Sequence, residues 1–332
     1  MLRRRSVLLA VAAAGLTPVR ADPVQSLPLA SAAARLKRLK MATIAGDDLG
    51  KIERWYAGAL NYRVMERGVV GAALALSWGA PAMAGRRLIV MQPEDGGDVF
   101  VRAVEIDAIA RAKPLTTWGW SAIEITVRDL DALYDKLKRG WLEAPIAVLG
   151  KPQALAANSP IFAMQVLGPA GEVLYLTSHT GDRTKSNHPE APRGLVGRPF
   201  IAVLAGPDLA ALKSFYTDGF DLGDQGDLSL PVASRAAAHG LPAGHVYTIS
   251  VLVCAERGNK MELDGFPSGT APQPRHDGQL PPGTAMMSFS VAGFGEIGTR
   301  TFQAPTALYG ATPAASFVGP AGEYVELIAD RL

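Results

Sequence analysis

The chain has 332 residues, of which 48% are hydrophobic, and a formal net charge of +2. This length suggests about two domains, and the hydrophobic fraction is sufficient for a buried core. The small net charge gives no indication of a nucleic-acid or strongly acidic partner. A single cysteine, Cys254, excludes an intramolecular disulfide and a site of several thiolates.

Residues 1–21 have the pattern of an export signal. A head of three arginines precedes a short apolar core at 7–16, which is too short to span a bilayer. Small residues at Val19 and Ala21 mark a cleavage site. The Arg4-Arg5 pair resembles a twin-arginine signal, with an ordinary secretory signal as the alternative. We expect a periplasmic protein, cleaved near Ala21, without stable membrane insertion.

The first half of the mature chain alternates strands with helices. The pattern predicts a strand at 40–45, an N-cap at Asp48 and a helix up to Leu60 whose apolar residues recur at helical spacing. A second N-cap, Asp129, precedes a helix with the same kind of stripe. That helix is predicted at 130–139. The remaining strands predicted in this half are 69–78, 87–92, 100–106, 118–127, 161–167 and 173–178.

A Gly- and Pro-containing segment of mixed charge at 180–198 predicts a linker, after which the same pattern returns. The sequence Gly-Pro-Ala-Gly-Glu occurs at 168–172 and again at 319–323. Gly-Pro-x-Gly favours a tight turn, and each copy precedes an alternating strand. A repeat separated by about 150 residues indicates two similar halves. We therefore predict an N-terminal domain at 38–179 and a C-terminal domain at 199–332.

Each half contains the order strand, helix and strands twice. The prediction is an α+β fold of four βαβββ modules, paired into two concave mixed sheets with the helices outside. We expect each half to close one such sheet, or cup, so that Glu262 and Glu326 both lie in the C-terminal cup.

These residues resemble the vicinal oxygen chelate superfamily, which includes glyoxalase I, bleomycin-resistance proteins and extradiol dioxygenases. The shared start of a module is a strand, an Asp, and a helix with an aromatic pair. Its shared end resembles Asp-Pro-Asp-Gly-Asn-x-Ile-Glu-Leu. The matching segments are Asp48 with 55–56 and 60–62, Asp208 with 215–216 and 219–220, and 168–176, 257–263 and 319–327.

The resemblance implies metal ligands on the first and last strands of each module. The first-strand positions fall near Met41, Ala122, Ile201 and Met286, none of which suits a hard divalent ion. The last-strand positions fall at Tyr175, Glu262 and Glu326. Two carboxylates alone make a poor transition-metal site. We therefore expect no metal and no other cofactor, although a site rebuilt around these carboxylates and His245 stays open.

The alternation of side chains predicts which residues face the cups. A Glu that points into an apolar cup is costly unless it is paired or protonated, so such residues are candidates for acid/base work. The candidate catalytic residues are Glu262, Glu326, His245 and Tyr247. The candidate ligand-binding residues are Glu124, Tyr175, Ile201, Met286 and Tyr324. The alternative interpretation is that shifted strands leave these Glu side chains in solvent.

Three functions are consistent with this pattern. The first is an exported isomerase or lyase that acts on a small oxygenated molecule by carboxylate acid/base chemistry without a metal. The second is a non-catalytic small-molecule-binding protein of the bleomycin-resistance type. The third is a metal-dependent, glyoxalase-like enzyme with a rebuilt site. The sequence gives no indication of the oligomeric state.

Overall fold

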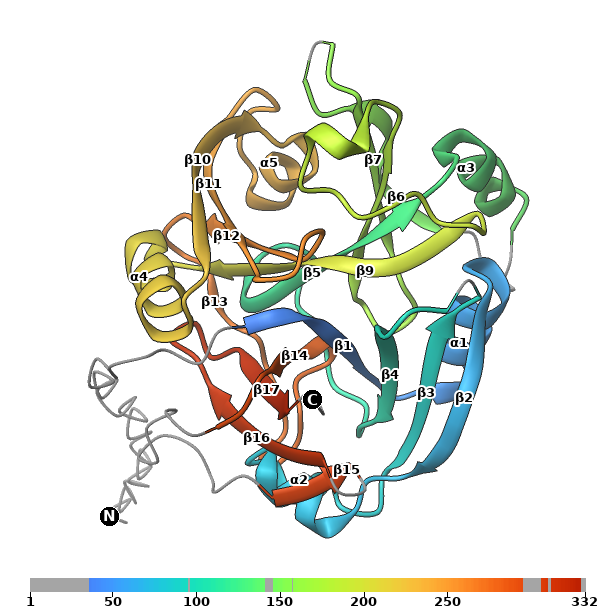
Figure 1. Cartoon of the computed structure of the whole chain (residues 1–332), viewed down its shortest axis with the longest axis vertical. Coiled ribbons are helices and arrows are strands. Elements are labelled where there is room, and N and C mark those ends of the chain that lie inside the picture. Colours follow the sequence, from blue (N-terminus) through green and yellow to red (C-terminus); the bar gives the residue numbers. More distant parts are fainter. Residues whose placement is uncertain are drawn as a thin grey trace, which may run out of the picture.

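The computed structural model describes residues 36–94, 96–140, 146–156, 158–294, 306–309 and 312–329. The predicted export signal lies outside these residues. The described chain forms the βαβββ modules predicted from the sequence (Figure 1). No helix among them is long and apolar enough to cross a membrane.

The first two modules contain eight strands. Module one consists of β1 (Leu36–Gly46), α1 (Leu49–Glu53), the π-helix η1 (Arg54–Ala59), β2 (Tyr62–Val69), α2 (Ala72–Ser77), the 3₁₀ turn η2 (Pro81–Met83), β3 (Arg87–Pro93) and β4 (Phe100–Glu105). Module two consists of β5 (Thr117–Val127), α3 (Leu130–Lys138), β6 (Ala147–Ala154), β7 (Ile161–Leu167) and β8 (Val173–His179).

The 3₁₀ turn η3 (Arg183–Lys185) lies in the predicted linker. Module three consists of β9 (Val196–Gly206), α4 (Leu209–Phe220), β10 (Gly223–Pro231), α5 (Ala233–His239), β11 (Val246–Val253) and β12 (Lys260–Gly265). The short β13 (Ala271–Pro272) leads into module four, with β14 (Gly283–Val291), β15 (Thr306–Tyr309), β16 (Thr312–Val318) and β17 (Tyr324–Ala329). The place of a helix in module four falls outside the described residues.

The helix starts agree with the sequence prediction. The carboxylates of Asp48, Asp129 and Asp208 each accept a hydrogen bond from the backbone N–H three residues later, at 2.9–3.0 Å. The prediction of a strand at 69–78 is wrong, because strand β2 ends at Val69 and α2 follows. The Ala- and Leu-rich run at 72–76 favours a helix. Helix α5, in the corresponding place of module three, was not predicted.

The modules pair in two sheets, and the pairing crosses the sequence halves. One sheet has the order β15-β16-β17-β14-β1-β4-β3-β2, and the other has β10-β11-β12-β9-β5-β8-β7-β6. We name each sheet after the two strands that pair antiparallel at its centre, and call them the β1–β14 sheet and the β5–β9 sheet. Each of these four strands is the first strand of its module. The expectation that each half closes its own cup is therefore wrong: modules one and four share one sheet, and modules two and three share the other.

Contacts outside the sheets still connect the modules of each half. The hydroxyl of Tyr216 on α4 donates to Glu323 Oε1 in the second Gly-Pro-Ala-Gly-Glu turn at 2.6 Å. In the first half, the hydroxyl of Tyr56 interacts electrostatically with the carboxyl of Glu172 in the first Gly-Pro-Ala-Gly-Glu turn. Each turn carboxylate also accepts from the backbone N–H two residues before it. The division into domains at 38–179 and 199–332 thus stays a prediction. The two sheets do not follow it, because each sheet contains one module from each half.

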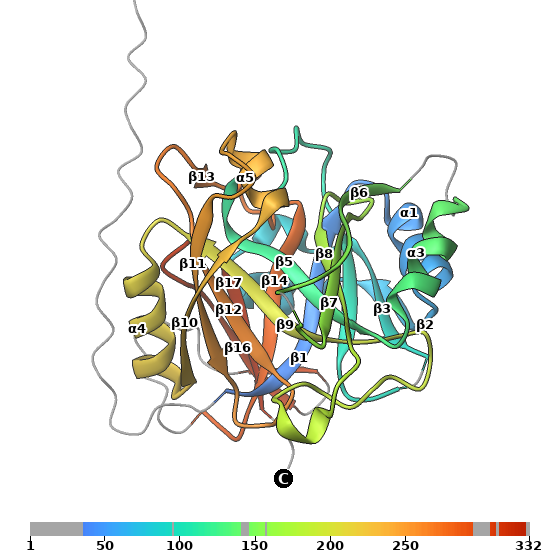
Figure 2. The same ribbon diagram turned by 90° about the horizontal axis from the view of Figure 1, so that it is seen from above.

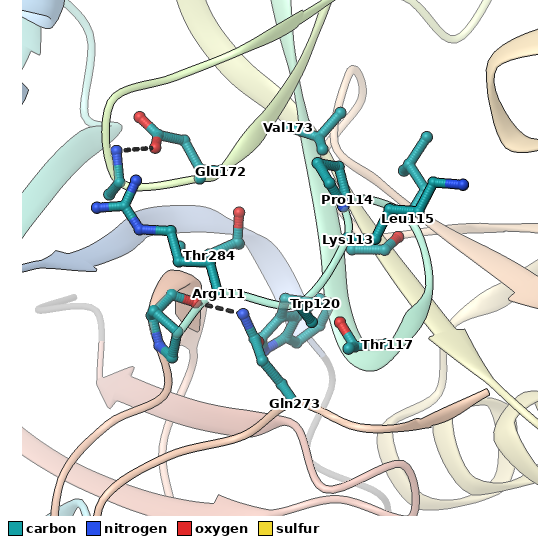
Figure 3. A pocket seen from close by; sticks show the side chains of 16 residues that line it. Arg111, Lys113, Pro114, Leu115, Thr117, Trp120, Glu172, Val173, Gln273 and Thr284 are labelled. Atoms are coloured by element: carbon teal, nitrogen blue, oxygen red, sulfur yellow. Dashed lines mark hydrogen bonds between the residues drawn. The ribbon is translucent and has the colours of Figure 1, made fainter. Parts of the chain in front are cut away.

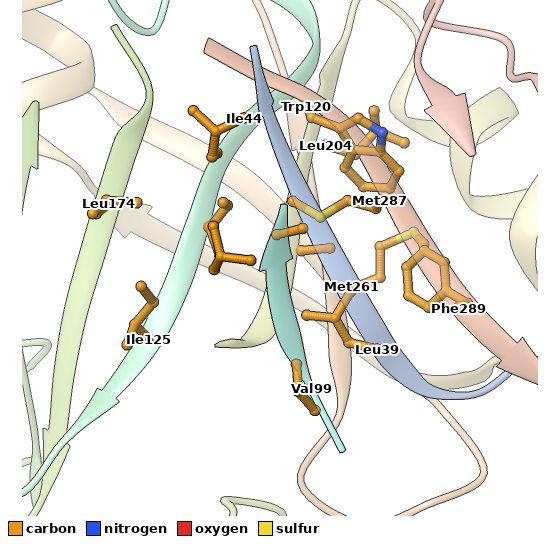
Figure 4. Packing of buried hydrophobic residues seen from close by; sticks show 14 of the residues in the cluster. Leu39, Ile44, Val99, Trp120, Ile125, Leu174, Leu204, Met261, Met287 and Phe289 are labelled. Atoms are coloured by element: carbon orange, nitrogen blue, oxygen red, sulfur yellow. The ribbon is translucent and has the colours of Figure 1, made fainter. Parts of the chain in front are cut away.

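The main core lies between the helix-side faces of the two sheets (Figure 4). Apolar residues of both sheets meet there, and Trp120 donates its indole N–H to the carbonyl of Tyr324 in the other sheet at 2.7 Å. Helices α1 and α3 lie together on one side of the molecule and α4 on the opposite side (Figures 1 and 2). The predicted alternation is confirmed: the side chains that share this core include Ile123, Ile125, Val127, Val325 and Leu327.

Candidate functional site

The concave faces of the two sheets divide the predicted site residues between them. We call these faces the β1–β14 cup and the β5–β9 cup. The expectation that Glu262 and Glu326 act in one cup is wrong, because they lie on β12 and β17 of different sheets. The β5–β9 sheet carries Glu124, Tyr175, Ile201, Tyr247 and Glu262, and the β1–β14 sheet carries Met286, Tyr324 and Glu326.

Glu326 is sealed in the β1–β14 cup by four donors. Its Oε1 accepts from the indole N–H of Trp78 at 3.0 Å and the hydroxyl of Tyr309 at 2.7 Å. Its Oε2 accepts from Ser288 Oγ at 2.6 Å and Arg102 Nη2 at 3.2 Å. Both charged side chains are at most 1% exposed. A buried carboxylate with four donors connects β17 to α2, β14, β15 and β4 and so contributes to holding the fold together.

Arg102 is equally constrained. Its guanidinium lies 4.5 Å from the ring of Trp78, and it donates to Thr43 Oγ1 at 2.9 Å and to the hydroxyl of Tyr309. Trp78 follows α2, so the helix that the sequence did not predict covers this ion pair. The β1–β14 cup therefore contains a charged pair packed under an aromatic lid.

The residues present do not fit the divalent metal that the family resemblance implies. The first-strand positions carry Met41, Ala122, Ile201 and Met286, whose side chains offer no oxygen or nitrogen donor. Among the described residues, no three His, Cys, Asp or Glu side chains are grouped to hold a metal ion. We derive no chemistry through a metal, and the expectation of a cofactor-free protein stays a prediction.

The β5–β9 cup contains a row of ionisable side chains. Glu124 of β5 and Lys260 of β12 both pair with Ile201 of the intervening strand β9, so the three side chains lie on one face. Glu262 follows Lys260 by two residues and shares this face. Tyr175 pairs with Glu124 from the other side. The adjacent strands β12, β9, β5 and β8 thus bring two carboxyls, an amine and a phenol together.

Burial sets the protonation of these groups. Desolvation raises the pKa of Glu124 to about 7, although the Thr177 hydroxyl and the Lys260 ammonium partly offset it. Desolvation and then the charge of Asp264 raise the pKa of Glu262 well above its ordinary range. Desolvation lowers the pKa of Lys260, against the opposing effect of Glu124 and Glu262. The cup therefore holds one carboxyl, Glu124, with a pKa near neutral pH and a second, Glu262, whose pKa is also raised.

Helix α5 closes one end of this row. Its Arg235 is 1% exposed and donates to Asp264 Oδ2 at 2.5 Å, while Glu262 Oε1 lies 3.6 Å from the same guanidinium nitrogen. The aromatic rings of Tyr247 and Phe266 lie 5.0 and 5.8 Å from the guanidinium. Asp264 is fully buried, whereas the Glu262 side chain is 16% exposed. The side chains of the row thus become more exposed from Asp264 towards Lys260.

Tyr247 and His245 lie at the closed end. The Tyr247 hydroxyl is 3.0 Å from His239 Nδ1, and its ring is buried. His245 is exposed, and its ring centroid lies 4.8 Å from that of Tyr247. Of the two predicted residues, Tyr247 belongs to the wall around Arg235, and His245 lies at the surface.

Two histidines that were not predicted as site residues lie at the other end of the row. The rings of His179 and His188 are 4.9 Å apart, and His188 also contacts Phe200. Desolvation, followed by the charge of Lys260, lowers the pKa of His188 to about 3. His188 is therefore a neutral wall of the cup at physiological pH.

Lys260, Asp264 and Arg235 were not predicted as site residues. The run Lys260-Met261-Glu262-Leu263-Asp264 alternates charged and apolar residues, which places three ionisable side chains on one strand face. That signal was available in the sequence. Arg235 had none, because its position depends on how α5 packs against β11 and β12.

Other hollows lie elsewhere in the described part of the chain, and two of them bear on function. One, beside the first Gly-Pro-Ala-Gly-Glu turn, has a volume of about 40 Å³ and is bordered by Arg111, Trp120, Glu172 and Gln273 (Figure 3). At roughly 10–15 Å³ per water on this measure, the space holds only a few water molecules. The other is a groove of about 680 Å³ at the mouth of the β1–β14 cup. Its apolar walls include Met41, Val90, Phe100 and Ile328.

The fold is that of solved proteins of the vicinal oxygen chelate superfamily. Glyoxalase I from Zea mays superposes with a TM-score of 0.58 at 16% identity, over 88% of this chain and 92% of its own. A putative dioxygenase from Bacillus subtilis superposes with a TM-score of 0.61 at 11% identity, over 90% of this chain and 87% of its own. No protein-family model and no curated protein matches the sequence. The predicted superfamily fold is confirmed, and at these identities the similarity establishes fold alone.

Proposed function

We propose that this chain, which has the two-cup vicinal oxygen chelate fold, is an isomerase or lyase that moves protons on a small oxygenated molecule. The site is the β5–β9 cup, and Glu124 and Glu262 are the acid/base pair. The observation that carries the proposal is that both carboxyls lie on one concave face and that burial brings the pKa of Glu124 to about 7. General acid/base groups work best when their pKa lies near the operating pH.

The two carboxyls have different environments, which separates their roles. Glu262 lies beside Asp264 and Arg235, and the Asp264 carboxylate favours its protonated form. Glu124 lies beside Thr177 and Lys260, which favour its charged form. We assign the base to Glu124 and the acid to Glu262, following the rule that neighbouring titratable groups in unlike surroundings divide acid and base. Arg235 holds Asp264 in place and acts as a positioning residue.

The test is hydrogen exchange into small substrates. The full chain is incubated in D2O with a panel of small aldehydes, ketones, hydroxy acids and esters, and loss of C–H signal is followed by NMR. We expect exchange at the carbon next to the oxygen-bearing group of at least one compound. E124Q and E262Q should each slow it by about 100-fold or more, the usual contribution of a positioned acid or base.

The matched control is E190Q, because the Glu190 side chain is 83% exposed and lies outside the cup. Its exchange rate should equal that of the unaltered protein. Unchanged rates in both E124Q and E262Q would refute the assignment.

A second candidate is a non-catalytic binding protein, and the groove of about 680 Å³ favours it. Its walls combine apolar side chains with Lys40, Glu66 and Asp98 at the rim. Absence of exchange with every compound, together with a ligand that binds and is released unchanged, would support this candidate instead.

Export to the periplasm is a further part of the proposal and is supported by the pattern of residues 1–21 alone. A small-molecule partner is expected from the cups. Cell fractionation of the full chain, compared with a form lacking residues 1–21, tests the location.

A further inference from the structure

Lys260 is the one amine in the row of ionisable groups that we have described, and in the acid/base mechanism it acts only through its charge on Glu124. It is partly exposed at the open end of the cup. Among the described residues, no carboxylate forms an ion pair with its ammonium group, although Glu124 and Glu262 act on it electrostatically. An amine that is held near two carboxyls but not tied to either is free to react.

The register of the sheet places this amine within reach of Glu124. The two residues are separated by one strand, since each pairs with Ile201. With neighbouring strands about 4.8 Å apart, their Cα atoms lie about 10 Å from each other. Two extended side chains that lean over a concave face span that distance. Glu262 lies on the same face of β12, two residues along, which is about 7 Å.

The surroundings favour an uncharged amine. Lys260 lies near the buried ring of His188, which is neutral at physiological pH. The fixed cation of this cup, Arg235, is neutralised by Asp264 at the other end of the row. Desolvation lowers the pKa of Lys260, which increases the fraction of free amine. Lysines in such desolvated sites serve as nucleophiles towards carbonyl carbons.

We propose that Lys260 forms an imine with the substrate, which is a small uncharged aldehyde or ketone bearing a hydrogen on the carbon next to its carbonyl. The inference deepens the proposed function and rests on it for the later proton transfer. An uncharged substrate follows because the guanidinium of Arg235, which could bind an anion, is already paired with Asp264 at the buried end of the row.

The chemistry balances with the groups present. The Lys260 amine attacks the carbonyl carbon, a C–N bond forms, and the amine proton passes to the carbonyl oxygen. A neighbouring carboxyl in its protonated form, Glu262, gives a second proton to that hydroxyl, which leaves as water. The resulting positively charged imine acidifies the adjacent C–H, whose proton the Glu124 carboxylate takes. Hydrolysis returns the amine, and no oxidant or reductant is consumed.

The experiment is reductive trapping. The full chain is treated at pH 7 with acetone or cyclohexanone and sodium cyanoborohydride, and the adducts are located by peptide mass spectrometry. We expect Lys260 to be alkylated several-fold faster than surface lysines, because desolvation lowers its pKa and leaves more of it as free amine. Lys138 and Lys185, whose side chains are 53% and 83% exposed, are internal controls.

K260R keeps the cation and removes the nucleophile, so it should show no preferred adduct while its circular dichroism stays unchanged. Alkylation of Lys260 at the rate of Lys138, or spread evenly over all lysines, would overturn the inference. The two proposals fail separately. If exchange in D2O is lost in E124Q but retained in K260R, the imine is overturned and the acid/base pair is kept. If Lys260 forms a selective adduct while exchange is unaffected in E124Q and E262Q, the imine is supported and the acid/base pair is overturned.

Discussion

Replacing Glu124 by Gln should stabilise the folded protein in a pH-dependent way. Glu124 is 7% exposed, and burial raises its pKa from the ordinary 4.5 to about 7. The folded protein therefore binds this proton more tightly than the unfolded chain does, so its stability falls as pH rises from about 4.5 to about 7 and stays low above that. A carboxyl kept for chemistry destabilises the fold that holds it.

The magnitude follows from the same shift. The difference between about 7 and 4.5, at about 1.36 kcal/mol for each pKa unit, corresponds to roughly 3 kcal/mol. Gln has nearly the same shape and cannot ionise, so E124Q should avoid that cost. We expect the unfolding free energy of E124Q to exceed that of the unaltered protein by up to about 3 kcal/mol at pH 8, and by almost nothing at pH 4.5.

Urea unfolding followed by tryptophan fluorescence at pH 4.5, 6, 7 and 8 measures the difference. E190Q serves as the control, since Glu190 is an exposed carboxyl that pairs with Arg257 in solvent. The reasoning is refuted if E124Q is no more stable than the unaltered protein at pH 8, or if its advantage is the same at every pH. Either result would mean that Glu124 is ionised without cost in the folded cup.

Three further outcomes are expected. R102M leaves Glu326 buried without its countercharge and should lower the unfolding free energy in urea by about 3–5 kcal/mol. The double variant R102M/E326L should recover a large part of that loss. A negligible loss in R102M would contradict the ion-pair assignment. Y216F removes the donor to Glu323 and should lower stability by about 1–2 kcal/mol at pH 7 in thermal unfolding, whereas Y134F, on the partly exposed α3 ring, should not. R235K replaces the guanidinium whose Nη2 donates to Asp264 by a more compact ammonium, so the pH profile of exchange should shift, a change that simple loss of folded protein would not produce.

The sequence predicted the modules because each begins with strong local signals. The Asp N-caps and the helical stripes of α1, α3 and α4 depend on neighbouring residues only, and the structure has them where they were predicted. The alternation in β5 also assigned Glu124 to the concave face correctly. Helix α2 was missed because the run before Trp78 is apolar throughout, which suits a buried strand as well as a helix.

The pairing of the modules could not be predicted in the same way. Which first strand lies beside β1 depends on contacts between residues at least 238 apart, such as Leu36 with Val291, and no local pattern reports them. The assumption that neighbouring modules pair put Glu262 and Glu326 in one cup. For the same reason Arg235, whose partners lie on a different element, was missed as a site residue.

The order in which the modules pair also bears on how the protein is made. Modules two and three are consecutive, so the β5–β9 sheet can close once about four fifths of the chain has left the ribosome, with synthesis at about 5–20 residues per second. The β1–β14 sheet instead joins the first module to the last, and β1 lacks its antiparallel neighbour until the final segment is made. A bare strand of this kind invites association with other chains during that interval. A nascent chain arrested before β14 should therefore aggregate or recruit chaperones more readily than the finished protein.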